Sequence, residues 1–260
     1  MFHAREYVRA GSLEEAYQLN QKKSGVLVGG MMWLKMAKLN KGTIIDLSGL
    51  GLDRIEEDED GFHIGCMCTL RQLELHQGLN RYFHNLFKEC TRHIVGVQFR
   101  NTATVGGSIF GRFGFSDILT CMLALDTTVE FYQSGTVALA DFAGNGAGRD
   151  VLVQIHIKKD GRIPAYVSQR NSKSDLPVIN CCLARDQEVC HISVGARPER
   201  AKVVTVRADQ MTGEHLKEVI GQFGFHDNMR AGGEYRRHLA EVYVRRLYTQ
   251  TEVIGNGEGA

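Results

Sequence analysis

The stretch RNTATVGGSI, residues Arg100–Ile109, decides how the rest of the chain is interpreted, because a polar, hydroxyl-rich run meets a glycine pair within it. Glycine has no Cβ, so its backbone can adopt unusual angles and approach another molecule closely. N–H groups exposed at such a bend form a concavity that suits an anion such as phosphate, and Thr102 and Thr104 add hydroxyl donors. One glycine pair is weak evidence by itself, and a plain turn between two strands explains it equally well.

A second stretch, GVLVGGMMWL at Gly25–Leu34, has the order of a buried strand, a glycine pair and a helix. This order is the usual layout of a phosphate site, because free N–H groups and the positive end of the helix dipole face the ligand. Two such turns in one chain suit a ligand with two phosphates. Neither has the G-x-G-x-x-G spacing of a Rossmann turn or a Walker A lysine, which excludes the usual nicotinamide and nucleoside-triphosphate sites.

Both stretches carry a family resemblance. Residues Arg100–Asp117, with CMLALD at Cys121–Asp126, resemble the R-N-x-A-T-x-G-G-N-I…S-D-L…L-L-A-L-D signature of the flavin subunits of molybdenum hydroxylases. Residues Val28–Asp46 resemble the A-G-G-T/H-x-L-L-x-x-M…I-D-L pattern of the same subunits. These are the FAD-binding medium subunits of enzymes of the xanthine dehydrogenase and carbon monoxide dehydrogenase type. The resemblance covers nearly the whole chain.

The resemblance implies an α+β fold, in which a two-lobed FAD-binding domain of the vanillyl-alcohol-oxidase-like (PCMH) type precedes a C-terminal α+β domain. We expect an N-terminal FAD-binding lobe at residues 1–52 and a second FAD-binding lobe at residues 53–159. The C-terminal α+β domain is expected at residues 160–260. The two lobes would clamp the cofactor between them.

Composition excludes several classes of function. The 260 residues carry a net charge of +1, which argues against nucleic acid or an anionic membrane as the main partner. No apolar run is long enough to cross a bilayer, and the N-terminus lacks the apolar core of a signal peptide, so we expect a cytoplasmic location. The 7 cysteines lack the spacing of a zinc or iron–sulfur site. We therefore expect no metal in this chain, and any iron–sulfur cluster must come with another chain.

Local patterns predict the elements in order. In the first fifty residues we expect a strand at Tyr7–Ala10, a helix capped by Ser12 with Glu15 completing a capping box, a strand at Val26–Val28, a helix from the glycine pair through Leu39, and a strand at Thr43–Leu47. Farther on we expect strands at Phe62–Met67, Thr128–Tyr132 and Val151–Ile157, and helices at Leu70–Gln77 and Asn85–Gly96. A helix or turn is expected at Ile118–Leu125. The acidic run Glu56–Asp60 indicates a solvated turn more than a metal or partner patch, and Gly144–Gly148 indicates a mobile turn.

The C-terminal third predicts three strands and two helices. The expected strands are Val178–Leu183, Val189–Gly195 and Ala201–Val206, and the expected helices are His215–Phe223 and Tyr235–Leu247. On the last helix we expect Tyr235, Leu239, Val242 and Leu247 to form the apolar face, with Arg236, Arg237, Arg245 and Arg246 outside as a solvated face or a docking face. The tail Gly255–Ala260 is expected to be disordered.

The resemblance also implies the site residues. The diphosphate would be lined by Leu27, Val28, Gly29, Gly30, Met31, Met32 and Trp33, and the other side of the cofactor by Thr104, Val105, Gly106, Gly107 and Ser108. Asp117 would bond to a sugar or ribityl hydroxyl, and Ile94 would pack near a ring. Tyr166 stands where the family has a lysine near the flavin, and Met31 and Ser108 also depart from the family's residues. The side chain of Arg112 would restore positive charge to the cofactor site.

The implied activity is electron relay. A molybdopterin-binding large subunit would oxidise the substrate, expected to be xanthine or another N-heterocycle, and a [2Fe-2S] small subunit would pass electrons to FAD on this chain. The FAD would then reduce NAD+ or another acceptor. We find no Ser-His-Asp or Cys-His set for nucleophilic catalysis. Two alternatives remain open, namely a stand-alone FAD oxidoreductase of related fold, such as a cell-wall sugar-nucleotide reductase, and a non-catalytic scaffold that has lost FAD.

Overall fold

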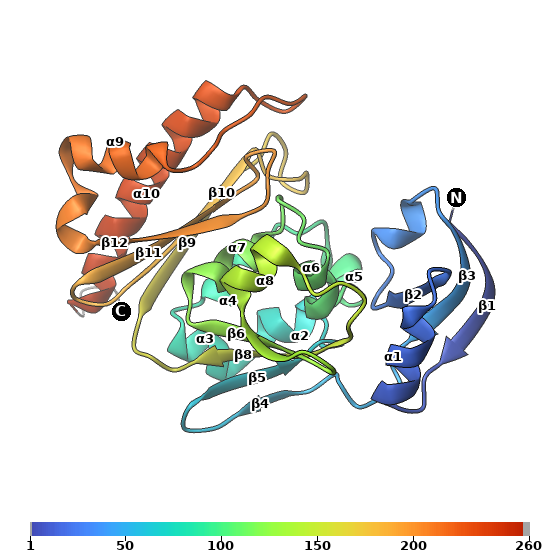
Figure 1. Ribbon diagram of the computed structural model, residues 1–260. Coiled ribbons are helices and arrows are strands. Elements are labelled where there is room, and N and C mark those ends of the chain that lie inside the picture. The colour runs from blue at the N-terminus through green and yellow to red at the C-terminus, as the bar shows by residue number, and fades with distance from the viewer. Residues whose placement is uncertain (1, 257–260) are drawn as a thin grey trace.

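Three sheets follow one another along the chain, and a computed structural model describes residues 2–256 of it (Figure 1). The first section is a parallel sheet with strand order β1-β3-β2. Its elements are β1 (His3–Arg9), α1 (Leu13–Gln21), β2 (Gly25–Val28), the 3-10 turn η1 (Leu34–Met36) and β3 (Asn40–Asp46). Ser12 caps α1 as expected, since its side chain accepts a hydrogen bond from Glu15 N at 3.1 Å. The Glu15 carboxylate bonds to Gly11 N instead of closing the expected box.

The prediction of a helix after the first glycine pair is wrong. Residues after Gly30 form only the short turn η1, and β3 already begins at Asn40. Met31 has a φ of 54°, a left-handed conformation that no α-helix can contain. The first glycine segment therefore has no helix N-terminus behind it, and any anion bound there must be held by loop N–H groups.

The second section is an antiparallel five-stranded sheet with strand order β4-β5-β8-β6-β7. Its strands are β4 (Ile55–Glu57), β5 (Gly61–Gly65), β6 (Thr127–Phe131), β7 (Gly135–Ala138) and β8 (Leu152–Lys158). The acidic run forms the expected turn between β4 and β5, where Asp58 Oδ1 accepts from Asp60 N and Gly61 N at 2.9 and 2.8 Å.

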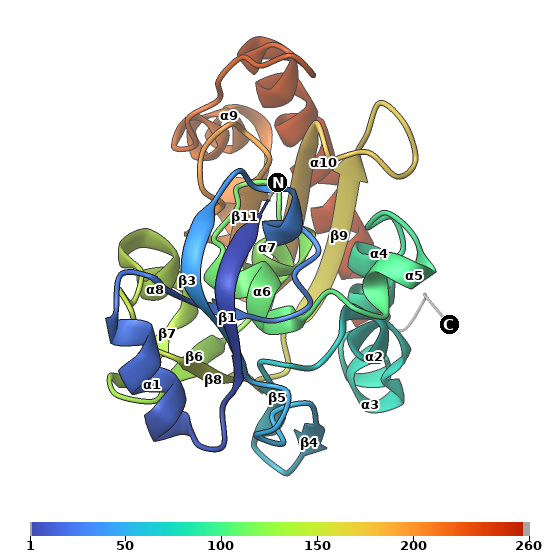
Figure 2. The same ribbon diagram turned by 90° about the vertical axis from the view of Figure 1, so that its right-hand side faces the viewer.

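Short helices cover this sheet and carry the second glycine pair (Figure 2). They are α2 (Leu70–Leu75), α3 (Gln77–Tyr82), α4 (Leu86–Thr91), α5 (Val97–Arg100), α6 (Val105–Phe110), α7 (Asp117–Ala124) and α8 (Leu139–Asn145). The helix expected at Asn85–Gly96 is shorter than predicted, and Val95, beyond its end, has a φ of 51°. Thr69 caps α2 with a full capping box.

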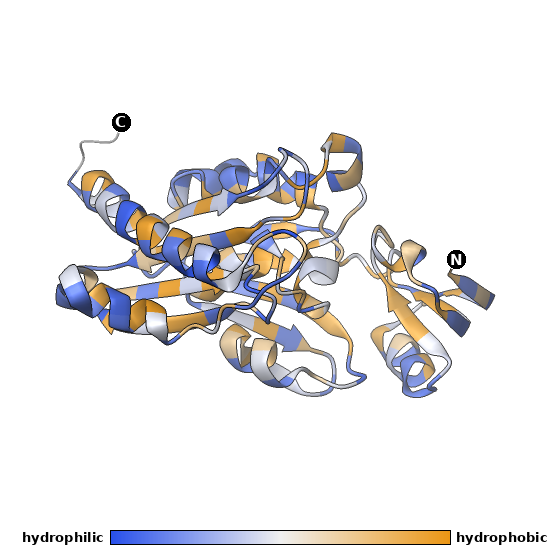
Figure 3. Ribbon diagram, turned by 90° about the horizontal axis from the view of Figure 1, so that it is seen from above, coloured by the Kyte–Doolittle hydropathy of each residue, from blue (hydrophilic) through white to orange (hydrophobic). Residues whose placement is uncertain are grey.

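The third section is an antiparallel sheet with strand order β12-β11-β10-β9. Its elements are β9 (Ile163–Gln169), β10 (Ile179–Arg185), β11 (Val189–Gly195), β12 (Lys202–Arg207), the 3-10 turn η2 (Ala208–Met211), α9 (Gly213–Gly221) and α10 (Gly233–Gly255). The bounds expected for β11 are confirmed, whereas β9 was not predicted as a strand. Helix α10 packs against β9 and β10, and Figure 3 shows its alternating polar and apolar residues.

The expected faces of the last helix need correction. Arg236 was predicted to point outward, but it is 0% exposed and donates to the carbonyl oxygens of Val178 and Ala196. Tyr235, predicted to be buried, is 51% exposed. The buried face consists of Ala240, Val244 and Leu247, at the helical spacing i, i+4, i+7. Arg237, Arg245 and Arg246 are exposed as expected.

The buried side chains form two apolar clusters. One extends from the first section into the second and includes Ile45, Phe62 and Ile109, and the other fills the space between the third sheet and helices α9 and α10. Each sheet lies within one of the three expected sections, whose boundaries stay predictions. No helix within residues 2–256 combines the length and the apolar character that crossing a membrane requires. Of the tail predicted to be disordered, Gly255 ends α10, and residues 257–260 lie outside the described part of the chain.

Candidate cofactor-binding cavity

A cavity of about 610 Å³ lies where the first section meets the second and where the 170–176 segment approaches. Its volume is typical of pockets that bury a small organic ligand. The lining includes all but two of the predicted site residues: Leu27, Val28, Gly29, Gly30, Met31, Met32, Trp33, Ile94, Thr104, Gly106, Gly107, Ser108 and Asp117. The two exceptions, Val105 and Tyr166, lie behind the wall.

The two glycine segments touch each other at this cavity. A Cβ placed on Gly29 would lie 2.3 Å from Thr104 Oγ1, and one placed on Gly30 would lie 1.8 Å from the Thr102 carbonyl oxygen. Only glycine allows so close an approach, because any side chain would overlap its neighbour. The segments at residues 29–30 and 102–104, more than seventy positions apart in sequence, thus form one continuous wall.

The second glycine pair does not form the bend that its sequence indicates. Gly106 and Gly107 lie in the first turn of α6, which Thr104 caps by accepting from Gly107 N at 3.1 Å. A Cβ on Gly106 would lie 2.5 Å from Cys66 O. The N–H groups of Val105, Gly106 and Ser108 bond to the carbonyls of Cys68, Cys66 and Thr104 at 2.8, 2.8 and 3.1 Å. These donors are therefore already used within the fold.

The first segment keeps its donors free. The N–H groups of Gly30, Met31, Met32 and Trp33 have no acceptor among the described residues. All four residues line the cavity, and Met31 reverses the chain with its φ of 54°. Successive N–H groups at a left-handed residue form an anion-binding concavity. Of the two glycine segments, this one fits a diphosphate.

Some of the strained backbone lies at the cavity. Met31 and Val95, with φ of 54° and 51°, line it, and Arg112, with φ of 46°, lies between the lining residues Gly111 and Phe113. Such conformations cost roughly 1–3 kcal/mol each and cluster at ligand sites. The expectation that Arg112 restores charge to the site is wrong, because its side chain is not part of the lining and packs over the Phe142 ring at 5.6 Å.

Asp117 reaches the cavity but is largely engaged within the protein. It begins α7 and is 4% exposed. Its carboxylate accepts hydrogen bonds from the Tyr166 hydroxyl, from Arg170 Nη2 at 2.7 Å and from Asn180 Nδ2 at 3.1 Å. A carboxylate has about four acceptor sites. Asp117 therefore keeps room for about one hydroxyl of a ligand, so the predicted sugar contact remains a prediction.

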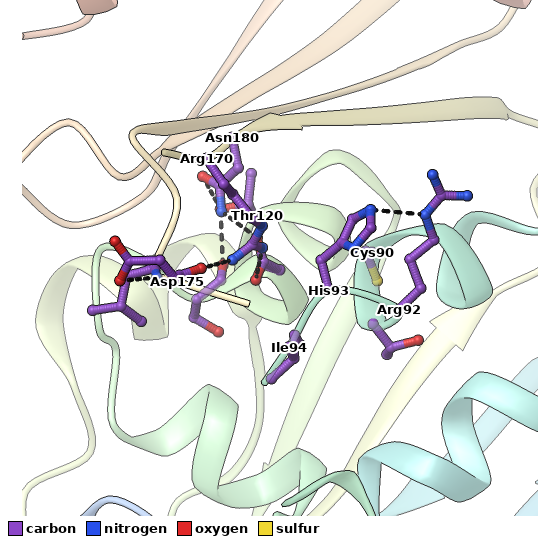
Figure 4. A network of polar contacts seen from close by, with 12 residues as sticks. Cys90, Arg92, His93, Ile94, Thr120, Arg170, Asp175 and Asn180 are labelled. Carbon is purple, nitrogen blue, oxygen red and sulfur yellow. Dashed lines mark hydrogen bonds and ion pairs between the residues drawn. The ribbon is translucent and has the colours of Figure 1, made fainter. Parts of the chain in front are cut away.

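Arg170 is the cavity residue that the sequence analysis passed over. Its side chain is 7% exposed and its guanidinium bridges Asp117 to the Asp175 carbonyl (Figure 4). Tyr166, in the place of the family's lysine, has a pKa raised well above its ordinary value by burial and by the Asp117 charge, so it stays neutral. The positive charge at this wall thus comes from Arg170, which lies four residues after Tyr166 in a passage that resembles the family's pattern only in outline.

The first residue of the opening stretch supports the cavity from behind. Arg100 forms a forked ion pair with Glu74 at 2.8 and 3.1 Å and also donates to Ile94 O at 3.2 Å. Burial alone would raise the pKa of Glu74, but hydrogen bonds from Arg100 and Arg71 bring it below its ordinary value. The pair fixes the turn that places Ile94 in the lining. Burial lowers the pKa of the neighbouring His93, which accepts from Arg92 Nε at 3.0 Å (Figure 4).

An aromatic cluster joins the sections at the cavity. Trp33 of the first section packs edge-on against Phe99 and Phe115 of the second, with ring centroids 5.6 and 5.8 Å apart. Phe113 stacks on Phe115 at 5.2 Å. All four rings line the cavity, so one wall is strongly apolar. Within residues 2–256, no three His, Cys, Asp or Glu side chains are grouped to hold a metal ion.

Comparisons with known proteins agree with this geometry. Residues 2–157 match the family described as the FAD binding domain in molybdopterin dehydrogenase. The chain is 24% identical over 257 residues to the uncharacterized protein YgfM of Escherichia coli strain K12, covering 96% of this chain and 97% of YgfM. It is 24% identical over 273 residues to the glyceraldehyde dehydrogenase medium chain of Sulfolobus acidocaldarius, with 94% and 97% covered. Quinoline 2-oxidoreductase from Pseudomonas putida 86 superimposes over 100% of both chains with a TM-score of 0.85 at 17% identity.

The superposition and the family match confirm the expected fold class, an α+β fold of the PCMH type. The matched residues contain both glycine segments and Asp117, and FAD is the cofactor of the family. The open cavity, the free N–H groups and the glycine cradle fit that cofactor. The chain belongs to the family of FAD-binding domains of molybdopterin dehydrogenases.

Proposed function

We propose that the chain is the flavin subunit of a molybdenum hydroxylase and binds FAD in the cavity. It would receive electrons from a [2Fe-2S] small subunit, which a molybdopterin-binding large subunit reduces, and pass them to NAD+ or another acceptor. FAD supplies the redox chemistry when bound, and the protein supplies orientation and electrostatics. The partners and the acceptor follow from the family resemblance.

The observation that carries the proposal is the row of free donors on the cavity wall. The N–H groups of Gly30–Trp33 face no acceptor within residues 2–256, and the glycine contact with Thr102 holds this row in place. We assign the diphosphate to these N–H groups. Thr104 and α6 then act as the surface against which the first segment is held, and Val105 supports them from the core.

The other end of the cavity would hold the redox-active ring. Ile94 offers an apolar contact there, and Arg170 offers a positive charge whose geometry is fixed by Asp117. A fixed cation favours negative charge on a neighbouring ring, and burial of the Arg170 side chain strengthens this effect. Asp117 keeps room for one ribityl or sugar hydroxyl. Tyr166 stays neutral and acts only through its bond to Asp117.

The substrate would be chosen on the molybdenum subunit. We propose an N-heterocycle, with xanthine as one example, because quinoline 2-oxidoreductase shares the fold over the whole chain. An aldehyde is the other class to test, given the likeness to a glyceraldehyde dehydrogenase medium chain. We also propose a cytoplasmic location, since all seven cysteines are free and buried, as is usual in a reducing compartment.

A scaffold that has lost FAD is the competing proposal. It is motivated by the N–H groups of α6, which are all bonded internally, and by Met31, Ser108 and Tyr166 at positions where the family has other residues. The purified chain should show flavin absorbance near 370 and 450 nm, roughly the bands of the cofactor itself. Capture from its native host should also bring down a large molybdopterin chain and a small cysteine-rich chain. A colourless chain that cannot be reconstituted with FAD would leave only the scaffold.

A further inference from the structure

The C-terminal end of α1 is completed by an arginine from another section of the chain. The last turn of α1 contains no basic residue, although the final carbonyls of a helix lack intrahelical partners and carry partial negative charge. Arg149, in the loop before β8, fills this place. Its Nη2 donates to Lys22 O at 2.6 Å and to Gly25 O at 2.9 Å, and its Nε donates to Asn20 O.

The contact is reciprocal. The Asn20 side chain is buried and donates from Nδ2 to Arg149 O at 2.6 Å, and Gln21 Nε2 donates to the same oxygen at 3.1 Å. Both the side chain and the main chain of Arg149 are therefore tied to the end of α1. A planar guanidinium can bond several carbonyls at once in fixed directions, which a lysine cannot do.

The loop that carries Arg149 is held by the second sheet. Asp150 is buried and its carboxylate accepts from Gln133 N, Ser134 N and Ser134 Oγ at 3.1, 2.8 and 2.6 Å. Gly146 N bonds to Phe142 O at 2.7 Å and closes α8. The turn expected at Gly144–Gly148 therefore starts later than predicted, since Gly144 and Asn145 belong to α8, and its mobility stays a prediction. The next two residues, Arg149 and Asp150, bond to residues far away in the sequence, and the glycine pattern gives no sign of these contacts.

Arg149 also lies at the cavity. Asn20, Gly25, Gly148 and Arg149 all belong to the lining. Gly25 is the first residue of β2, a strand of 4 residues that leads directly into Gly29. A shift of Gly25 must therefore displace the row of free N–H groups relative to α6. Figure 3 shows the first section beside the rest of the molecule, and the Arg149 contacts are among those that connect the two.

We propose that Arg149 is a positioning residue for the cofactor site, which fixes the first section against the second by bonding the end of α1. This inference rests on the proposed binding of FAD in the cavity. Arg149 acts through β2, which it holds in the register that aligns the Gly30–Trp33 N–H groups with the cavity. A site that is assembled before the ligand arrives binds more tightly, because less order must be created on binding.

The test uses the full chain with Arg149→Ala and Arg149→Lys. We expect FAD to bind at least tenfold more weakly to Arg149→Ala, about 1.4 kcal/mol, with Lys restoring part of the loss. Hydrogen exchange should accelerate in peptides covering Gly25–Leu34 and stay unchanged in β9–β12. Arg245→Ala is the control, since this exposed side chain bonds only to Glu241 of its own helix among the described residues.

The outcomes separate the two proposals. Wild-type FAD affinity and unchanged exchange in Arg149→Ala would overturn the positioning role, as would accelerated exchange throughout the chain, which indicates a general loss of stability. If the wild-type chain binds no FAD, the proposed function fails. Hydrogen exchange of the Gly25–Leu34 peptides in Arg149→Ala then still decides whether Arg149 positions this segment.

Discussion

Replacing Gly30 by alanine tests the contact on which the cavity depends. A Cβ at this position would lie 1.8 Å from Thr102 O, whereas contacts below 3.0 Å essentially do not occur, so the two segments must separate by at least 3.0 − 1.8 = 1.2 Å. The neighbouring atoms are backbone, and Thr102 is followed closely by the residue that caps α6. A side-chain rotation therefore cannot relieve the overlap.

The expected loss follows from this displacement. Overpacking of a well-packed site costs about 1–3 kcal/mol. The free chain relieves this cost by separating the two segments, and bringing them together again around FAD weakens binding roughly 5- to 150-fold. Trp33 is the only tryptophan of the chain and lines the cavity next to Gly30. Quenching of its fluorescence by added FAD measures the affinity directly, and urea unfolding of the apo chain measures any loss of stability.

Gly144→Ala is the matched control. Gly144 lies in α8, and a Cβ there would have nothing within 4 Å. Alanine in a helix is favoured over glycine by roughly 0.5–1 kcal/mol, so this variant should bind FAD as the wild type does and unfold at equal or higher urea. If Gly30→Ala also kept wild-type FAD affinity, the two segments would not need their contact, and the assignment of the diphosphate to this wall would be withdrawn.

Three further predictions concern the residues around the cavity. Asp117→Asn should destabilise the chain by roughly 3–5 kcal/mol in urea unfolding, because it leaves the buried Arg170 charge without its partner; an unchanged midpoint would contradict this. The pKa of Glu74 is lowered in the fold, so its contribution to stability is present above the unfolded value of about 4.3 and is lost as pH falls through the folded pKa. Glu74→Gln should therefore flatten the loss of stability as pH falls below about 4.3, and an equally steep loss would refute the role of the Arg100 pair. Val95→Gly should raise the urea midpoint by removing strain of about 1 kcal/mol, and an unchanged or lower midpoint would contradict this.

Local sequence patterns predict those features of this fold that depend on neighbouring residues. The cap at Ser12 and the bounds of β11 are confirmed, because each depends on residues a few positions apart. The pairing of the two glycine segments on one cavity was anticipated through the family resemblance. Periodicity alone does not indicate that distant residues meet.

The missed features all depend on partners far away in the sequence. The helix expected after Gly30 fails because Met31 adopts a left-handed conformation against the second section. The buried position of Arg236 depends on carbonyls at Val178 and Ala196. Arg170 becomes a cavity residue only through Asp117, more than fifty positions earlier. A charged residue with such partners has no local signature, since the same residue type usually indicates a solvated face.

The two glycine pairs look alike in the sequence but act differently in the fold. Gly29 and Gly30 lack a Cβ so that a loop can pack against the Thr102–Thr104 backbone while its own N–H groups stay free for a ligand. The missing Cβ of Gly106 allows α6 to lie against Cys66, and the Gly106 N–H donates to the Cys66 carbonyl oxygen. One pair therefore supplies donors and the other supplies the surface that holds them. Under the proposed function, this division of roles would assign the diphosphate to the first segment, whose N–H groups are free, and would leave the second segment as the surface that holds it.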